Sequence, residues 1–379
     1  MRICLVFDCL YPHTVGGAER WYRNLAESLA HRGHTVTYLT LLQWDRATGA
    51  GVPNMDVVAV AGRAELYAHG RRSIGAQIRF AFGVWRHLLA HGGRYDVVQT
   101  PALHVSLLAV LAARPIRRFA LVVDWFEVWT REYWLGYLGG VAGRLGWWCQ
   151  RISARAKHHA LCFSRRHARR LEQIGYRGQI TLLEGLLPPG KEAAEPMPAE
   201  LTVVFAGRLI PEKQATALVP AVALARQRVP ELRATIFGDG PERDALLRLI
   251  DESGLDGAVQ APGFVAGELV EDAVRRALCF VFPSRREGYG QVVVEAASVG
   301  TPTVVVDAPD NAAVELVEDG VNGFVARSAE PKELGEAILR VHAAGPALRE
   351  STADWFRRNR ERLSLETSVE RVLAVYGRR

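Results

Sequence analysis

The sequence predicts an α/β fold with two Rossmann-like domains, each built on a parallel sheet. Short apolar runs alternate with amphipathic stretches from end to end, which is the pattern of parallel strands covered by helices on both faces. The chain has 379 residues, more than one hydrophobic core usually accommodates. The alternation stops over residues 184–200, where prolines, glycines and charges replace it, and then starts again.

The predicted elements follow from the spacing of apolar residues. Short apolar runs indicate strands, and apolar positions three or four apart indicate helices. We expect strands at residues 3–7, 35–40, 57–60, 97–100 and 119–123, and again at 202–206, 233–237, 258–261, 279–282 and 303–306. Helices are expected at 18–31, 74–90, 214–228, 241–253, 268–277, 291–299 and 331–343, with a further helical stretch at the C-terminal end.

The interruption in this pattern places the domains. We expect an N-terminal domain at residues 1–186, a linker at 187–200 and a C-terminal domain at 201–360. A helix at 361–379 is expected to cross back to the N-terminal domain. Ligands of such sheets bind beyond the carboxyl ends of the strands, so the expected site is the cleft across which the two domains face each other.

Composition indicates a soluble globular protein of the cytoplasm. Apolar residues make up 49% and charged residues 23%, and no apolar run is long enough to cross a membrane. The first apolar run, at 3–7, is too short for a signal peptide. Five scattered cysteines show neither a disulfide framework nor metal-ligand spacing, which favours a reducing compartment.

Charge is unevenly distributed along the chain. Residues 1–190 carry 24 basic and 12 acidic side chains, a net charge of +12, whereas residues 191–379 carry 23 and 29, a net charge of −6. A basic half suits phosphates, nucleic acid or an anionic membrane face. An ordinary solvated surface is the alternative interpretation.

Two loops have the composition of anion sites. Gly16 and Gly17 follow the first strand and precede a helix, so their backbone N–H groups and the helix N-terminus suit an anion, although a tight turn alone would also explain them. Arg208 and Lys213 follow the strand at 202–206. This pair of cations suits a diphosphate, and a surface ion pair is the alternative.

A third loop combines carboxylates with glycines that leave the main chain accessible. Glu287 is followed by Gly288 and Gly290, which let a ligand approach the main chain closely, and a helix begins near Gln291. Glu295 lies about one turn inside that helix and can reach the same pocket. Carboxylates in this arrangement can bind sugar and ribose hydroxyls while the backbone donors hold phosphate.

These residues resemble a known family. Glu287 and Glu295, separated by seven residues around Gly288-Tyr289-Gly290, are similar to the motif of glycosyltransferase family 4, a group of retaining enzymes with the GT-B fold. Further segments match in the expected order along nearly the whole chain. They are Gly16-Gly17-Ala18-Glu19, Gly207-Arg208 with Lys213, Gly238-Asp239-Gly240-Pro241 and Gly263-Phe264-Val265.

The resemblance implies a role for each matching residue. Gly16 and Gly17 would meet the diphosphate of a nucleotide-sugar donor, of UDP or GDP type, from the N-terminal, acceptor-side domain. Arg208 and Lys213 would neutralise that diphosphate, and Val265 would lie near the base. The sugar pocket would be formed by Glu287 with Gly288, Tyr289 and Gly290, and Glu295 would hold the ribose.

The residue inventory favours metal-independent transfer with retention. No Asp-x-Asp sequence is present to seat a chelated metal, and arginine, lysine and helix N-termini can stabilise a departing diphosphate instead. Retaining enzymes of this kind are thought to use the leaving phosphate as the base, so that the protein supplies position and electrostatics. No other cofactor is expected. The acceptor is expected to be a small molecule, a glycan or a lipid-linked sugar.

One position departs from the family pattern. Members often carry a histidine after the strand that is expected to end at Val123, in a context like Asp-Trp-His-Glu, whereas this chain has Asp124-Trp125-Phe126-Glu127. Phe126 cannot bond a sugar hydroxyl. Asp124 is therefore the catalytic candidate there, with Glu127 a second polar group and His13 or His104 possible substitutes.

An aromatic segment follows. Five of the nine tryptophans lie between Trp125 and Trp148, and basic residues from Arg151 to Arg170 come next. This combination suits peripheral contact with the inner membrane face, a hydrophobic acceptor pocket, or a helix packed on the core. Trp134, Leu138, Val141, Leu145 and Trp148 recur at helical spacing and predict a helix, which several glycines between Gly136 and Gly146 weaken.

Other function classes fit less well. A dehydrogenase is disfavoured because Arg243 stands where a dinucleotide fingerprint that begins at Gly238 needs a small residue. A basic nucleic-acid-binding protein lacks a recognition motif, and we expect no nucleic-acid partner. A sugar-nucleotide epimerase or hydrolase on the same fold is the nearest alternative.

Overall fold

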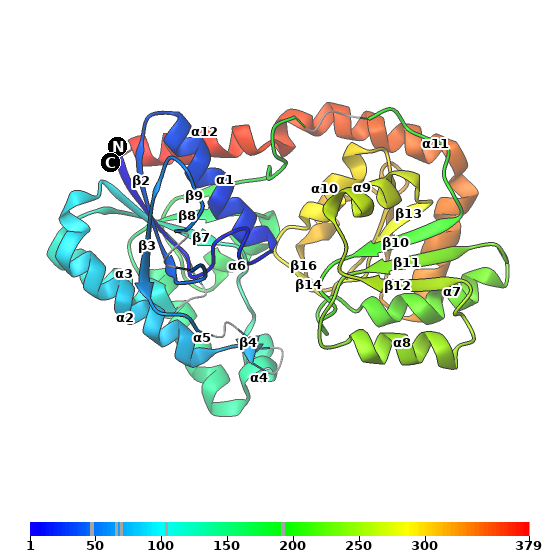
Figure 1. The fold of residues 1–379 in the computed structure, drawn as a ribbon, viewed down its shortest axis with the longest axis horizontal. Coiled ribbons are helices and arrows are strands. Elements are labelled where there is room, and N and C mark those ends of the chain that lie inside the picture. Colours follow the sequence, from blue (N-terminus) through cyan, green and yellow to red (C-terminus); the bar gives the residue numbers. More distant parts are fainter. Residues whose placement is uncertain (46–48, 65–66, 69–70, 103–104, 191–193, 379) are drawn as a thin grey trace. The chain divides into compact units, whose positions relative to one another are not determined.

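The structure is a computed structural model and describes residues 1–45, 49–64, 67–68, 71–102, 105–190 and 194–378. It divides into two compact units. The N-terminal unit comprises Met1–Pro188 together with the stretch that begins at Leu365, and the C-terminal unit comprises Pro189–Ser364. Each unit is an α/β domain on a parallel sheet, as predicted (Figure 1).

The N-terminal unit is built on seven parallel strands in the order β3-β2-β1-β6-β7-β8-β9. The strands are β1 (Arg2–Val6), β2 (Thr35–Leu41), β3 (Asp56–Ala61), β6 (Val97–Pro101), β7 (Ala120–Trp125), β8 (His159–Cys162) and β9 (Ile180–Leu182). A short antiparallel pair, β4 (Tyr67–Ala68) and β5 (Arg71–Arg72), lies outside this sheet.

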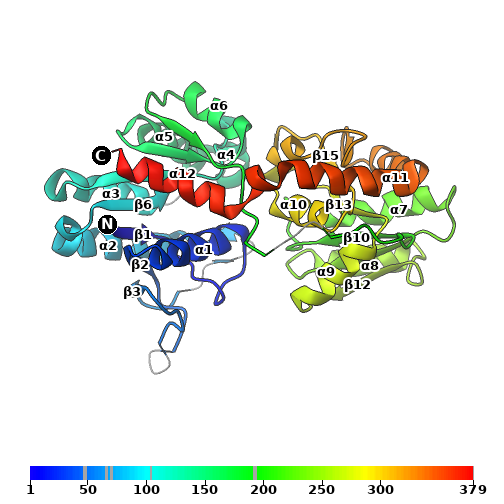
Figure 2. The same cartoon turned by 90° about the horizontal axis from the view of Figure 1, so that it is seen from above.

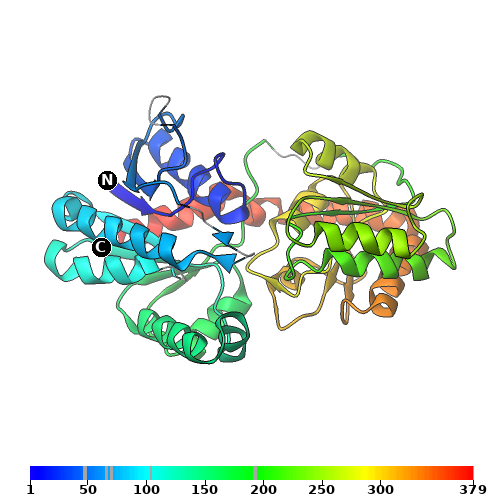
Figure 3. The same cartoon turned by 60° about the horizontal axis from the view of Figure 1, so that its bottom comes forward.

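Helices cover both faces of that sheet. Figure 2 shows α1 (Gly17–His31) and α12 (Leu365–Gly377) together on one face. The opposite face carries α2 (Ile74–His91), α3 (Val105–Arg117), α5 (Gly140–Arg155) and α6 (Arg165–Gln173) (Figure 3). The short helix α4 (Arg131–Leu138) packs on α5.

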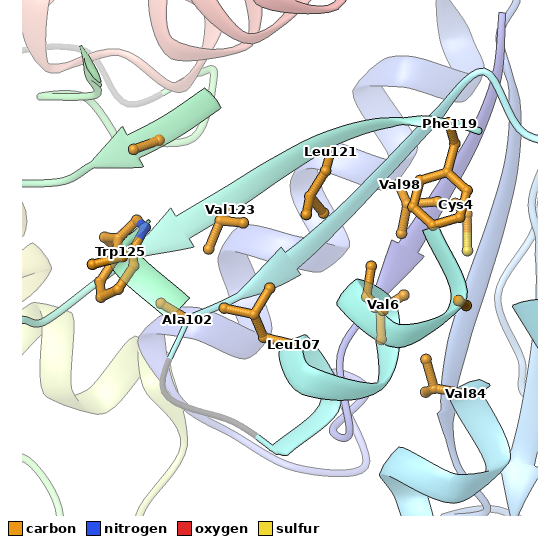
Figure 4. Packing of buried hydrophobic residues seen from close by; sticks show 14 of the residues in the cluster. Cys4, Val6, Val84, Val98, Ala102, Leu107, Phe119, Leu121, Val123 and Trp125 are labelled. Carbon is orange, nitrogen blue, oxygen red and sulfur yellow. The ribbon is translucent and has the colours of Figure 1, made fainter. Parts of the chain in front are cut away.

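The main core of this unit lies between the second group of helices and the sheet. Val6, Val98 and Val123 project from adjacent strands toward Leu107 of α3 and Val84 of α2, and all five side chains are fully buried (Figure 4). These side chains carry no polar atoms that burial would leave unpaired, and burial of each stabilises the fold by about 1.5–3 kcal/mol.

None of the helices described here has the length and hydropathy needed to cross a bilayer.

The C-terminal unit is built on six parallel strands in the order β12-β11-β10-β13-β15-β17. They are β10 (Thr202–Ala206), β11 (Arg233–Phe237), β12 (Val259–Gly263), β13 (Cys279–Phe282), β15 (Thr303–Val306) and β17 (Gly323–Ala326). The helices are α7 (Leu218–Arg226), α8 (Arg243–Glu252), α9 (Gly267–Arg276), α10 (Gln291–Ser298) and α11 (Pro331–Leu363), the last broken at Gly345. Two short strands, β14 (Arg286–Glu287) and β16 (Asp310–Asn311), pair beside the sheet.

Three regions differ from the elements predicted above. Strand β7 continues to Trp125, two residues beyond its expected end. The aromatic segment forms two helices separated at Gly139, which adopts a φ of 84°, instead of one continuous helix. In the expected linker, the Ala194 N–H donates to the Ser298 carbonyl (2.9 Å), so this part packs on the C-terminal unit.

Candidate functional site

The loops that follow β10, β11 and β12 are joined into one edge by backbone hydrogen bonds. The Gly207 N–H donates to the Phe237 carbonyl (3.1 Å), and the Leu209 N–H to the Asp239 carbonyl (2.9 Å). The Gly238 N–H donates to Gly263 (2.9 Å). These bonds satisfy backbone groups beyond the strand ends and fix the loops relative to one another.

Close packing between these loops explains two glycines of the Gly238-Asp239-Gly240 segment. Gly238 has a φ of 130°, and a Cβ there would overlap the Gly207 carbonyl. Gly240 has a φ of 154°, and a Cβ would overlap the Leu209 carbonyl. Both conditions exclude larger residues, so these glycines shape the loop that carries Arg208.

Lys213 and Glu287, two predicted site residues far apart in sequence, form an ion pair at this edge. The Lys213 ammonium donates to Glu287 Oε2, and the two side chains are only 17% and 21% exposed. The ammonium also lies 4.7 Å from the centroid of the Phe282 ring. A partly desolvated cation is thus held where an anionic ligand would meet it.

Backbone contacts hold the Glu287 loop in place. Strand β14 pairs with β16, which sets Glu287 opposite Asn311. The Arg285 N–H donates to the Glu212 carbonyl (3.0 Å), which ties the loop after β13 to the loop after β10. Glu287 and Lys213 therefore belong to two loops that are fixed to each other.

Asn311 is a supporting residue that sequence reasoning missed. Its amide donates to the Val306 carbonyl (2.9 Å), and its Oδ1 accepts from the Ala313 N–H (3.0 Å). This second bond caps a 3-10 helix, Ala312–Leu316. Asn before a short apolar run is a recognisable cap signal, but sequence alone does not place it beside Glu287.

Gly288, Tyr289 and Gly290 bring the backbone to the N-terminus of α10. All three residues are buried. Gly290 has a φ of 101°, and a Cβ there would lie 2.6 Å from the Ala313 Cβ, so only glycine fits without rearrangement. One turn later, Gln291 Nε2 donates to Glu295 Oε1 (3.1 Å), which orients that carboxylate.

The strand order arranges the remaining candidates in a row. Val265 follows β12, Arg208 follows β10, and Glu287 comes after β13, so the three follow strands of one sheet in that order, with β11 between β12 and β10. Arg208 is exposed and Val265 is half-buried. Of the candidates predicted in the C-terminal domain, Lys213 and Glu287 are in direct contact, and the others follow strands of the same sheet or belong to α10.

The glycine loop of the N-terminal unit opens α1. Gly16 is the N-cap residue in an extended conformation, and a Cβ there would overlap the Glu19 carboxylate. Gly17 has no atom within 4 Å of the position of a Cβ. The start of α1 therefore presents accessible backbone, which suits the predicted anion contact.

Asp124 lies in a different environment from the one expected of a catalytic group. It is fully buried and lies in β7, which extends past its predicted end. Gln99 Nε2 donates to both of its carboxylate oxygens (2.9 and 2.8 Å), and the Tyr376 hydroxyl of α12 donates to Gln99 Oε1. Burial raises the pKa of Asp124 to about 7. The structure therefore assigns Asp124 to the core and not to a surface that substrate can reach.

Phe126 is part of an aromatic group at the end of β7. Its ring stacks on Phe163 with centroids 4.5 Å apart and lies 6.3 Å from the Tyr22 ring. Of the histidines considered as substitutes, His13 lies 3.2 Å from the Ala50 carbonyl, and His104 lies outside the described residues. Among the described residues, the rings that contact Phe126 are those of Phe163 and Tyr22.

Comparisons with known proteins agree with this architecture. Residues 16–184 match the glycosyl transferase 4-like domain, and residues 192–361 match the glycosyl transferases group 1 family. Each of the two units therefore matches a glycosyltransferase domain model, and the fold of the chain is GT-B. Among solved structures of this type, HepE of Anabaena with UDP and glucose covers 100% of both chains with a TM-score of 0.75 and 20% identity. WaaG, a glycosyltransferase of lipopolysaccharide biosynthesis, gives a TM-score of 0.74 at 16% identity, also over 100% of both chains.

Curated relatives match part of this chain in sequence. It is 32% identical over 152 residues to the alpha-D-kanosaminyltransferase of Streptomyces kanamyceticus, which is 40% of this chain and 39% of the relative. It is 33% identical over 176 residues to the D-inositol 3-phosphate glycosyltransferase of Streptomyces griseus, which is 43% of this chain and 37% of the relative. The matched region thus spans about two fifths of these relatives' length.

Proposed function

We propose that this chain is a retaining glycosyltransferase that moves a sugar from a nucleotide-diphosphate donor, of UDP or GDP type, to an acceptor hydroxyl without a metal ion. The observation that carries this proposal is the Lys213–Glu287 pair beside the N-terminus of α10. An ammonium, a carboxylate and the backbone N–H groups at the start of α10 lie at one sheet edge, and a sugar diphosphate requires groups of these kinds.

The Lys213–Glu287 pair suggests how the donor is received. In our proposal the diphosphate takes over the Lys213 ammonium, since its greater charge competes well with a single carboxylate. Glu287, released from Lys213, then accepts hydrogen bonds from the sugar hydroxyls. Arg208 on the same loop neutralises the diphosphate further and stabilises it as it leaves.

The rest of the edge is proposed to bind the nucleoside and the sugar. Glu295, oriented by Gln291, accepts from the ribose hydroxyls. Val265 follows β12, which is two strands from β10 in the sheet, and it lies against the base. Gly288, Tyr289 and Gly290 line the sugar pocket with backbone N–H groups.

The N-terminal unit is proposed to bind the acceptor, a small molecule, glycan or lipid-linked sugar, and to add a phosphate contact through Gly16 and Gly17. The acceptor attacks the face that the phosphate leaves, and the phosphate oxygen takes its proton. No protein nucleophile is needed, so the buried position of Asp124 does not obstruct this route. The protein contributes by orienting the reactants and stabilising developing charge.

Metal independence rests on the side chains present. The chain contains no Asp-x-Asp sequence, and Arg208 and Lys213 supply positive charge at the proposed diphosphate site. Catalysis by arginine, lysine and a helix N-terminus is therefore the simplest scheme.

A panel of UDP- and GDP-sugars tests the function. We expect one donor to release nucleotide faster when an acceptor alcohol is supplied, and the product's anomeric configuration, read by NMR, to match that of the donor. Release that is indifferent to every acceptor would identify a hydrolase, and conversion of the sugar without release would identify an epimerase. An inverted product would refute the retaining scheme.

A further inference from the structure

Exposed apolar side chains are concentrated on one part of the N-terminal unit. Of the sixteen large hydrophobic side chains exposed in the described part of the chain, ten lie on α2, α3 and α5. They are Ile74, Ile78, Phe82 and Trp85 on α2, Leu108 and Ile116 on α3, and Val141, Leu145, Trp148 and Ile152 on α5. On α2 and α5 they recur every three or four residues, so each helix presents a continuous apolar stripe.

The three helices cover the same face of the seven-stranded sheet. Val84 of α2, Val110 of α3 and Ala154 of α5 all pack into the core cluster that also contains Val98 and other strand residues. Their opposite sides therefore point away from the sheet in the same general direction, as Figure 3 shows for the helices. We call this outward surface the α2/α3/α5 face.

The charge of this face has a single sign. The three helices contain no Asp or Glu, but they contain seven arginines. These are Arg79, Arg86, Arg114, Arg117, Arg144, Arg151 and Arg155. Helix α6, which packs on the same side of the sheet through Leu171, adds four arginines against one glutamate. On the other side of the sheet, α1 carries both Glu19 and Glu27.

Tryptophan and arginine are paired at the edge of the apolar stripe on α5. The Arg151 guanidinium lies 5.5 Å from the Trp148 ring centroid and 5.9 Å from that of Trp147. Trp148 is 54% exposed. At the C-terminal end of α3, Arg114 and Arg118 line a hollow with Leu111, Pro115 and Phe119. Amphipathic rings beside arginines are typical of surfaces that contact lipid headgroups.

We propose that the α2/α3/α5 face binds the surface of an anionic phospholipid bilayer. The apolar stripes enter the boundary between headgroups and acyl chains, and the arginines pair with lipid phosphates. A second copy of the chain fits less well, since docking this face on itself would set arginines against arginines. Nucleic acid also fits less well, because it offers nothing to cover ten exposed aliphatic and aromatic side chains. The proposal is independent of the reaction catalysed.

Flotation with vesicles tests this binding on the full chain. We expect the protein to float with vesicles of phosphatidylcholine mixed with phosphatidylglycerol at low salt, and much less with phosphatidylcholine alone or at high salt. Leu145→Ser and Phe82→Ser should each lower the partition coefficient about tenfold, and Arg144→Gln about fivefold, because each removes one buried apolar contact or one charge.

Leu269→Ser supplies the matched control, because Leu269 is 60% exposed on α9 of the other unit. We expect it to leave flotation unchanged. All variants should retain the wild-type circular dichroism and melting temperature, since the substituted side chains are exposed. Absence of the wild type from anionic vesicles at low salt would overturn the proposal. So would equal losses in Leu269→Ser, or a dimer in sedimentation that Leu145→Ser converts to monomer.

Discussion

Replacing Asp124 with asparagine should change how the stability of the N-terminal unit depends on pH. Burial raises the pKa of Asp124 to about 7, compared with 3.8 for an ordinary aspartate. Between these two values the folded chain keeps a proton that the unfolded chain has released. The stabilising effect of that proton is complete below the unfolded pKa and is lost as the pH rises through the folded pKa.

The size of the effect follows from the two pKa values. From about pH 5 to about pH 8, this one group should lower the free energy of unfolding by about 2–3 kcal/mol. Asp124→Asn removes the titrating proton while keeping the side chain's size, so the variant should lose this part of the pH dependence. Relative to the wild type it should therefore gain stability toward alkaline pH.

Urea unfolding followed by tryptophan fluorescence measures this directly, because eight of the nine tryptophans lie in the N-terminal unit. Glu132→Gln, at an exposed position in α4, is the control for removing one surface carboxylate from the same unit. If the stability difference between wild type and Asp124→Asn does not change with pH, Asp124 is not the buried titrating group described above.

Four further outcomes are expected. Lys213→Ala should lower turnover by about two orders of magnitude, while Arg228→Ala, which removes an exposed cation of the same unit, should not; equal rates would remove Lys213 from the mechanism. Activity should survive excess chelator, and a loss restored by magnesium or manganese would contradict the metal-free scheme. Because Phe126 cannot bond a 6-hydroxyl, a 6-deoxy donor should be used about tenfold to a hundredfold more efficiently than its hydroxylated counterpart, and the reverse preference would refute this. Gly290→Ala should destabilise the C-terminal unit by about 1–3 kcal/mol in thermal unfolding, more than Gly254→Ala, whose φ is also positive but whose Cβ would meet open space; similar losses would show that crowding is unimportant.

The sequence was most informative where a single element determines the outcome. Short continuous apolar runs identified the strands at the centre of both sheets, because central parallel strands are buried on both faces. The loop motifs could be located because each follows such a strand. For that reason Lys213 and Glu287 were both selected as candidates, and the structure joins them by an ion pair.

Edge strands and buried polar groups were harder to predict. Strands β9 and β17 lie at sheet edges, and each is short and contains Thr or Gly, so neither shows a continuous apolar run. Strand β8 lies inside the sheet, but it begins with His159 and was missed for the same reason. Asp124 was predicted as a catalytic candidate, but Gln99 donates to its carboxylate and Tyr376, 277 residues after Gln99, donates to Gln99. No local pattern reveals contacts between residues so far apart in the chain. The glycines of the aromatic segment predicted a weak helix, but a Cβ at Gly146 would overlap the Trp134 ring, so this glycine allows α4 and α5 to pack closely.

The position of α12 affects the order in which the protein can be completed during synthesis. Residues 1–188 leave the ribosome before the whole C-terminal unit, and α12 follows only after that unit. Until then, the surface that buries Val369, Val372 and Tyr376 remains open to water, and Gln99 lacks its partner from α12. The C-terminal unit is contiguous in sequence and can fold as soon as it emerges, so the unit that is made first is the one that is completed last.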